Sequence, residues 1–206
     1  LMFRNISDRE YESLNACKKS EYKALANLDV AEKNAWLDSL RLDKPFEGRE
    51  EFFQTHWQRL NALGNNPYLQ AETLVRNMQA LGAEGVTYLE TQVSVGNFVS
   101  SDGSKVSMDE AVDILRERLA QQDAKDTGVM VRFQIAVLRF LPSAEDSLRT
   151  AYKFVHDNAE EFVAINFVGR EDNDKGYPLR FLPTLRELRR QYSGVNLSIH
   201  AGEVDE

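Results

Sequence analysis

The chain has 206 residues, of which 42% are hydrophobic and 28% are charged, and it contains a single cysteine. These values are typical of a globular domain and exclude a collagen-like, low-complexity or disulfide-stapled chain. The 33 acidic residues outnumber the 25 basic ones, and the net charge of −8 argues against binding to a nucleic-acid backbone.

Other features of the composition concern the compartment. No apolar run approaches the roughly 20 residues that a transmembrane helix requires, so no membrane partner is expected. Residues 1–5 lack the layout of a signal peptide, and a lone cysteine fits a reducing compartment. The sequence therefore favours a cytoplasmic protein, with a secreted or periplasmic one left open.

Residues 1–84 are predicted to be helical. Ser7 and Glu10 have the spacing of a capping box at a helix start. Apolar residues then recur at helical spacing as far as a Pro- and Gly-containing break near residue 45. Two further helices are expected over residues 50–63 and 68–81, separated by a Gly-Asn-Asn-Pro turn.

The pattern changes at residue 85, where runs of strand-forming residues begin to alternate with helical stretches. Helices are expected between the strands, the first opened by a second capping box at Ser107 and Glu110. The strands begin about 33 to 43 residues apart, which is the rhythm of βα units in a parallel sheet. The expected strands cover residues 86–93, 129–138, 162–168 and 195–200.

Side-chain alternation along these strands favours a barrel over an open sheet. Successive strand residues face opposite ways, and each predicted strand has one apolar face and one face with polar groups, such as Glu90, Gln134 and Asn166. An open doubly wound sheet is apolar on both faces. Polar groups that converge from several parallel strands fit the interior of a barrel, at the end where active sites are built.

The stretch most informative about chemistry is residues 198–203. It places His200 at the end of a strand and Glu203 three residues later, separated by Ala and Gly. Imidazole is a good zinc ligand, and a carboxylate beside a metal can act as an acid or a base. Taken as a bare spacing, a buried histidine followed by an acidic turn is the more common explanation.

Three segments together resemble the adenosine deaminase family of zinc-dependent TIM-barrel hydrolases. Residues 200–203 match its His-Ala-Gly-Glu motif at the end of the fifth strand. Residues 164–171 resemble the fourth-strand segment Asp-Leu-x-Gly-x-Glu, and residues 86–90 resemble the second-strand Tyr-x-Glu segment. The three occur in family order, and the resemblance covers about residues 49–206.

The resemblance implies a partial TIM (β/α)8 barrel with a helical N-terminal segment. Residues 1–84 would be that segment, within the same catalytic domain, and residues 85–206 would supply strands two to five. The implied reaction is zinc-dependent hydrolytic deamination of adenosine or deoxyadenosine to inosine or deoxyinosine and ammonia. His200 would be a zinc ligand, Glu203 the proton donor to purine N1, and the Gly169 N–H the donor to purine N3.

The chain departs from the family pattern at several points. Asn166 replaces the usual Asp, and Gln92 stands where the family commonly has Arg. Phe52 and Phe53 fall where the family lines its substrate mouth, although helix core is at least as good an explanation. His56 is expected on the surface, as is the remaining histidine of the chain, in the helix after Pro142.

Essential parts of the family site are not present in these residues. The family takes two zinc ligands from a His-x-His pair on its first strand, and this chain has three histidines, none in such a pair. Its further ligands would lie beyond Glu206, so the single zinc ion would draw the remaining ligands from outside this chain. The chain is therefore expected to be truncated at both ends and inactive alone.

Alternative functions stay open at this stage. The protein could act on another adenine-containing small molecule, or it could be a binding or regulatory protein that kept the deaminase fold and lost catalysis. Asn166 and Gln92 favour the second of these, and the intact His200 and Glu203 count against it. An unrelated open α/β domain would make three ordered motif matches a coincidence. The oligomeric state is not indicated.

Overall fold

The computed structural model describes residues 8–93, 98–169 and 175–203. The chain divides into two compact units. The first comprises residues 1–77 and 97–124, and the second comprises residues 78–96 and 125–206.

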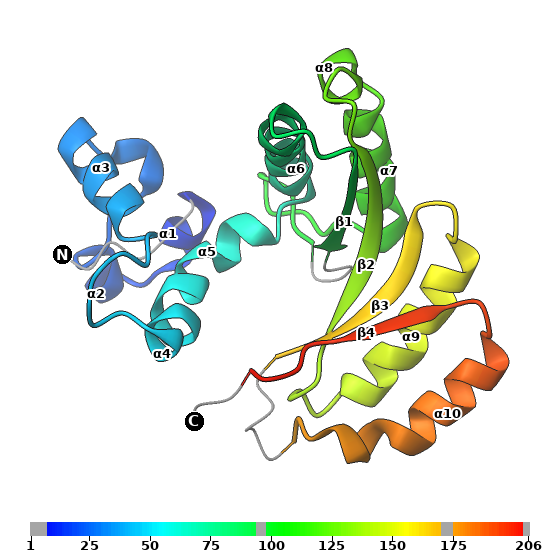
Figure 1. The fold of residues 1–206 in the computed structure, drawn as a ribbon. Helices are drawn as coiled ribbons and strands as arrows, with labels where there is room; N and C mark the ends of the chain where they lie inside the picture. Colours follow the sequence, from blue (N-terminus) through cyan, green and yellow to red (C-terminus); the bar gives the residue numbers. More distant parts are fainter. Residues whose placement is uncertain (1–7, 94–97, 170–174, 204–206) are drawn as a thin grey trace. The chain divides into compact units, whose positions relative to one another are not determined.

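The first unit is built from helices, drawn from blue to green in Figure 1. Predicted helical segments are found over residues 49–64 and 67–83, the former interrupted by one π-helical turn. In chain order the elements are α1 (Asp8–Ser13), α2 (Ala16–Lys19), η1 (Leu25–Asn27), α3 (Val30–Asp38), α4 (Arg49–Glu51), η2 (Phe52–His56), α5 (Trp57–Gly64), α6 (Pro67–Ala83), α7 (Met108–Leu119) and α8 (Gln122–Lys125). The last residues of α6 and of α8 belong to the second unit.

The region before residue 40 is more broken than its apolar spacing predicts. The Asn15 side chain accepts a hydrogen bond from the N–H of Lys18 and begins α2. Asp29 and Glu32 form a reciprocal capping box that begins α3. Such side chains satisfy free N–H groups at a helix start, so each begins a new short helix. The expected box at Ser7 lies outside the described residues.

The second unit is a parallel sheet with covering helices. Within the described residues its strands are β1 (Tyr88–Val93), β2 (Met130–Leu138), β3 (Phe162–Val168) and β4 (Asn196–Ile199). Each begins within two residues of its predicted start. The helices that follow β2 and β3 are α9 (Ala144–Asp157) and α10 (Leu182–Gln191), the latter preceded by the 3-10 turn η3 (Pro178–Phe181).

The strand order identifies the kind of parallel sheet. All neighbouring strands are parallel, and their order across the sheet is β1-β2-β3-β4, the same as their order in the chain. Helices α9 and α10 lie on the same face of the sheet (Figure 1). A doubly wound sheet reverses its strand order and has helices on both faces, whereas a (β/α)8 barrel does neither. The second unit thus has the topology of part of a barrel.

Side-chain parity agrees with the sequence. Along β2 the residues Phe133, Ile135 and Val137 are buried against the helix side, whereas Gln134 and Leu138 lie on the open face. Helix α9 contacts both β2 and β3. The core of this unit joins the strands to α9 and α10, and its most buried members include Ile135, Phe162, Ile165, Leu148, Tyr152 and Leu188. No described helix is long and apolar enough to cross a membrane.

Candidate functional site

The predicted site lies where β4 ends. His200 follows β4 directly, and its backbone N–H donates to the Phe167 carbonyl at 2.9 Å, which continues the β3–β4 pairing by one residue. Gly202 has φ of +77°, a left-handed conformation that glycine adopts readily. Glu203 follows with its side chain 21% exposed. His200 and Glu203 therefore occupy the carboxyl edge of the sheet, as predicted.

The imidazole of His200 is held by β3. Its Nδ1 lies 2.9 Å from Oδ1 of Asn166, which pairs in register with Ser198. Asn166 is 6% exposed, so its amide must find partners within the protein. This contact leaves Nε2 as the ring nitrogen available to a metal. A metal-bound histidine commonly has its other nitrogen oriented in this way.

The open face carries a row of polar side chains that ends at His200. Asn166 Nδ2 donates to Gln134 Oε1 at 2.7 Å, and Gln134 Nε2 donates to Glu90 Oε2 at 2.5 Å. The Tyr88 hydroxyl donates to Glu90 Oε1 at 2.7 Å. Hydrogen bonds from Tyr88 and Gln134 lower the pKa of Glu90, and the hydrogen bond to Glu90 raises the pKa of Tyr88. This row, hereafter the amide row, links side chains of β1, β2 and β3 to His200, directly after β4.

Arg139, just after β2, is a residue that sequence reasoning missed. It is fully buried, and its Nη2 donates to the His200 carbonyl at 2.9 Å and lies 3.8 Å from Oε2 of Glu203. One guanidinium nitrogen thus contacts both ends of the His-Ala-Gly-Glu segment. Its Nε and Nη1 have no hydrogen-bond partner among the described residues. The only signal in the sequence is an arginine directly after an apolar strand.

Gly169 lies at the end of β3, next to this segment in the sheet. It is buried, has φ of +100°, and packs so closely on Phe140 that a Cβ would lie 2.8 Å from the ring. The position is therefore shaped for glycine. The remaining residues of the fourth-strand match, Arg170 and Glu171, lie outside the described residues.

The residues at this edge of the sheet provide one candidate zinc ligand, His200, but not a complete set of ligands. His200 has the free ring nitrogen and the oriented partner that a ligand needs. Over residues 8–93, 98–169 and 175–203, however, no group of three or more His, Cys, Asp or Glu side chains is placed to hold a metal ion. A zinc ion at His200 would require further ligands.

The other histidines differ in their surroundings. His56 was expected on the surface but is 5% exposed, with Nε2 3.3 Å from Glu47 Oε1. Backbone N–H groups of Lys44 and Asp43 lower the pKa of Glu47 and keep a negative charge beside the ring. This carboxylate provides a partner for Nε2 of the buried ring. His156 is exposed on α9, as predicted.

The remaining sequence candidates belong to the first unit. The Phe52 and Phe53 rings meet edge to face, with centroids 5.1 Å apart, and Trp57 packs on Phe52 at 5.8 Å. Phe52 stays 37% exposed. Cys17 is exposed and unpaired by any disulfide. The arrangement explains these rings as a local cluster and leaves their role at a substrate mouth a prediction.

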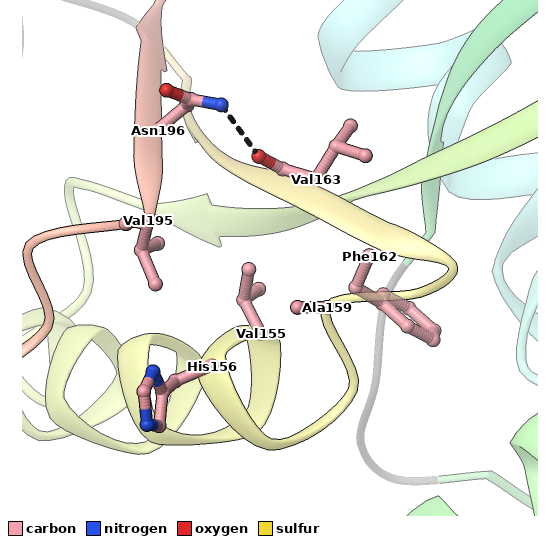
Figure 2. A pocket seen from close by; sticks show the side chains of 8 residues that line it. Val155, His156, Ala159, Phe162, Val163, Val195 and Asn196 are labelled. Atoms are coloured by element: carbon pink, nitrogen blue, oxygen red, sulfur yellow. Dashed lines mark hydrogen bonds between the residues drawn. The ribbon is translucent and has the colours of Figure 1, made fainter.

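A hollow of about 200 Å³ lies at the opposite end of β3 and β4 (Figure 2). It is lined by the end of α9 and the first residues of both strands, where Asn196 Nδ2 donates to the Val163 carbonyl at 3.1 Å. In barrels this end of the strands serves stability, and active sites form at the carboxyl end. The hollow is therefore separate from the His200 site.

Comparison with known proteins places the fold. The sequence matches no model of a protein family, and it matches no curated protein. In structure the chain is similar to an amidohydrolase with bound zinc from Burkholderia ambifaria, with a TM-score of 0.58 and 19% identity over 96% of this chain. It is also similar to an adenine deaminase from Arthrobacter aurescens, with a TM-score of 0.60 and 17% identity over 98% of this chain.

These alignments cover 49% and 55% of the two longer proteins, so the chain spans about half the length of each. At such identities the likeness concerns the fold. Together with the sequential strand order, it confirms the predicted fold class, an α/β partial TIM barrel with a helical N-terminal segment.

Gly169→Ala is expected to lower the free energy of unfolding by about 1–3 kcal/mol. The new methyl group would have to displace the Phe140 ring, and the backbone conformation disfavours alanine. Gly194→Ala is the matched control, because a Cβ there meets nothing within 4 Å, and it should cost less than about 0.5 kcal/mol. Urea unfolding of both variants measures this, and equal costs would contradict the packing argument.

Arg139→Met is expected to loosen the His200 segment without unfolding the protein. Losing the bond to the His200 carbonyl should speed hydrogen exchange of the His200 amide by about tenfold or more. A buried, partly unpaired charge is replaced by an apolar chain, so global stability should change little. Arg149→Met, which removes an exposed partner of Glu187, is the control. Unchanged exchange at His200 in the Arg139 variant would contradict the assignment.

Proposed function

We propose that this chain carries part of the active site of a zinc-dependent aminohydrolase that deaminates adenosine or deoxyadenosine. The observation that carries the proposal is the arrangement at the carboxyl edge of the partial barrel. There His200 presents one ring nitrogen with the other hydrogen-bonded to Asn166, and Arg139 contacts both His200 and Glu203. Active sites of TIM barrels form at this edge.

Each site residue has a role in the proposal. His200 supplies one zinc ligand through Nε2. Glu203 donates a proton to purine N1, which makes C6 more electrophilic, and the Gly169 backbone N–H binds N3. A bound zinc would supply Lewis acidity and lower the pKa of water. Glu203 is half-buried at the same edge of the sheet, with Oε2 3.8 Å from Nη2 of Arg139.

A second candidate substrate is adenine itself. One structural neighbour is an adenine deaminase, and it has the higher TM-score of the two described above. Both substrates present the same amino group at C6 and the same N1, so the roles of His200 and Glu203 are unchanged. They differ in the ribose at N9, which the base lacks. Initial rates with adenosine, deoxyadenosine and adenine discriminate between them.

The central test compares two substitutions in the full-length protein. His200→Ala should abolish stoichiometric zinc, because it removes a ligand. Glu203→Gln should retain zinc but lower kcat by about 10²–10⁴, the range for removing a general acid. Zinc is measured by elemental analysis, and deamination by the change in purine absorbance.

His156→Ala is the control for loss of an imidazole, since this residue is exposed on α9. It should leave both zinc content and rate unchanged. Near-normal turnover by the Glu203→Gln protein would refute the assigned role of Glu203. Full zinc content in the His200→Ala protein would refute that of His200.

The 206-residue chain alone is expected to bind zinc poorly and to be inactive. The part of the chain that the structure describes offers no cluster of three candidate ligands, and one imidazole with one carboxylate does not hold zinc tightly. The purified chain with added zinc should show no adenosine turnover above background. Sustained turnover by this chain would contradict the proposal that the ligand set is completed elsewhere.

A further inference from the structure

We propose that Glu90, two strands away from Asn166, fixes which nitrogen of His200 carries the proton, and so which one is free for metal. The inference rests on the proposed function, because it assigns positioning residues to the same site. It is carried by the amide row from Glu90 through Gln134 and Asn166 to His200. None of the three positioning residues needs to touch substrate.

The direction of the row is set at its Glu90 end. An ionised carboxylate can only accept hydrogen bonds. A glutamate is ordinarily ionised at neutral pH, and the hydrogen bond from Tyr88 lowers the pKa of Glu90 further. Of the two possible orientations of the Gln134 amide, only the one with the NH₂ group facing Glu90, at 2.5 Å, gives a hydrogen bond.

The remaining links follow one from another. With its NH₂ group on Glu90, Gln134 turns its Oε1 toward β3, where only a donor is favourable. Asn166 meets it with Nδ2 at 2.7 Å and must then turn Oδ1 toward His200. An oxygen 2.9 Å from Nδ1 requires Nδ1 to carry the hydrogen. The neutral ring thus has its lone pair on Nε2.

The burial of Asn166 keeps its amide in the orientation that its hydrogen bonds to Gln134 and His200 require. Asn166 is 6% exposed, so water does not readily replace a mismatched partner there. A reversed Asn166 amide would place two acceptors face to face against Gln134. It would also leave a buried donor unpaired or force the other tautomer on His200, and polar groups inside proteins rarely stay unpaired.

The row also explains why position 166 holds an amide. A carboxylate there would accept from His200 but would face Gln134 Oε1 as a second acceptor. The single NH₂ group of Gln134 already donates to Glu90, so it cannot also donate to a carboxylate at position 166. Asn166 offers an acceptor to His200 and a donor to Gln134 together. The resemblance to the family predicts Asp at this position, and the neighbours found here require Asn.

The test reads the tautomer of His200 directly by ¹⁵N NMR of the metal-free chain, at a pH near 8 where an ordinary imidazole is neutral. With three histidines in the chain, the His200 signal is identified by its loss in His200→Ala. The wild-type chain should show the Nδ1–H form in about tenfold excess. Glu90→Gln, whose amide can face Gln134 with either group, should give a mixture of both forms.

Tyr88→Phe is the matched control, because it removes the other donor to Glu90 and leaves the carboxylate in place. It should leave the tautomer unchanged. In the full-length protein, Glu90→Gln should also weaken zinc affinity by about 10- to 100-fold, as loss of such an outer partner does.

A wild-type chain with Nε2–H dominant, or a Glu90→Gln chain with an unaltered tautomer, would overturn the inference. These outcomes are independent of catalysis. A protein that shows the expected tautomers but neither retains zinc nor deaminates purines would overturn the proposed function and leave the role of Glu90 standing.

Discussion

The parallel hydrogen-bonded register of β1 to β4 is the constraint on which the site depends. Parallel pairing in sequential order brings the carboxyl ends of neighbouring strands to one edge of the sheet. It also directs the side chains of the even-numbered residues in all of the described strands to the same face. Asn166 therefore lies opposite Ser198, two residues before His200. A one-residue slip would turn each of these side chains to the helix side, where the core has no room for them.

Two different kinds of contact hold His200 in that frame. On the open face, Asn166 orients the ring. Beneath the strand end, the buried guanidinium of Arg139 holds the backbone carbonyl of the same residue and lies near Glu203. Burying a charge with incomplete pairing is costly, so stability alone is a poor explanation for Arg139. Its contacts instead fix where the acidic side chain lies relative to the histidine.

The sequence predicted the parts of this structure that depend on local signals. Runs of β-branched and aromatic residues between turn residues located all of the described strands, and alternation along them separated the open face from the core. The region before residue 40 was predicted less well, because the capping side chains of Asn15 and Asp29 begin new helices within an apolar pattern. Sequence spacing alone does not show which of two competing signals prevails.

For the proposed site, motifs in the sequence named candidate residues, but the side chains that contact them were not predicted. His200, Glu203 and Gly169 were identifiable because they lie in contiguous segments. Arg139 contacts a carbonyl 61 positions away in the chain, and Gln134 joins side chains from β1 and β3. Such pairings arise only once the register is formed, and no spacing rule encodes them. The contact between His56 and Glu47 was missed for the same reason.

The amide at position 166 shows how this changes the functional argument. Judged from the sequence alone, Asn166 replaces a charged Asp of the family pattern, which favours a protein that kept the fold and lost catalysis. In the structure, the same side chain must accept from His200 and donate to Gln134, and a carboxylate can do only the first. The negative charge lies at Glu90, at the far end of the row, where two donors meet it. The substitution is thus matched by its neighbours, and it no longer counts against a metal-binding role for His200.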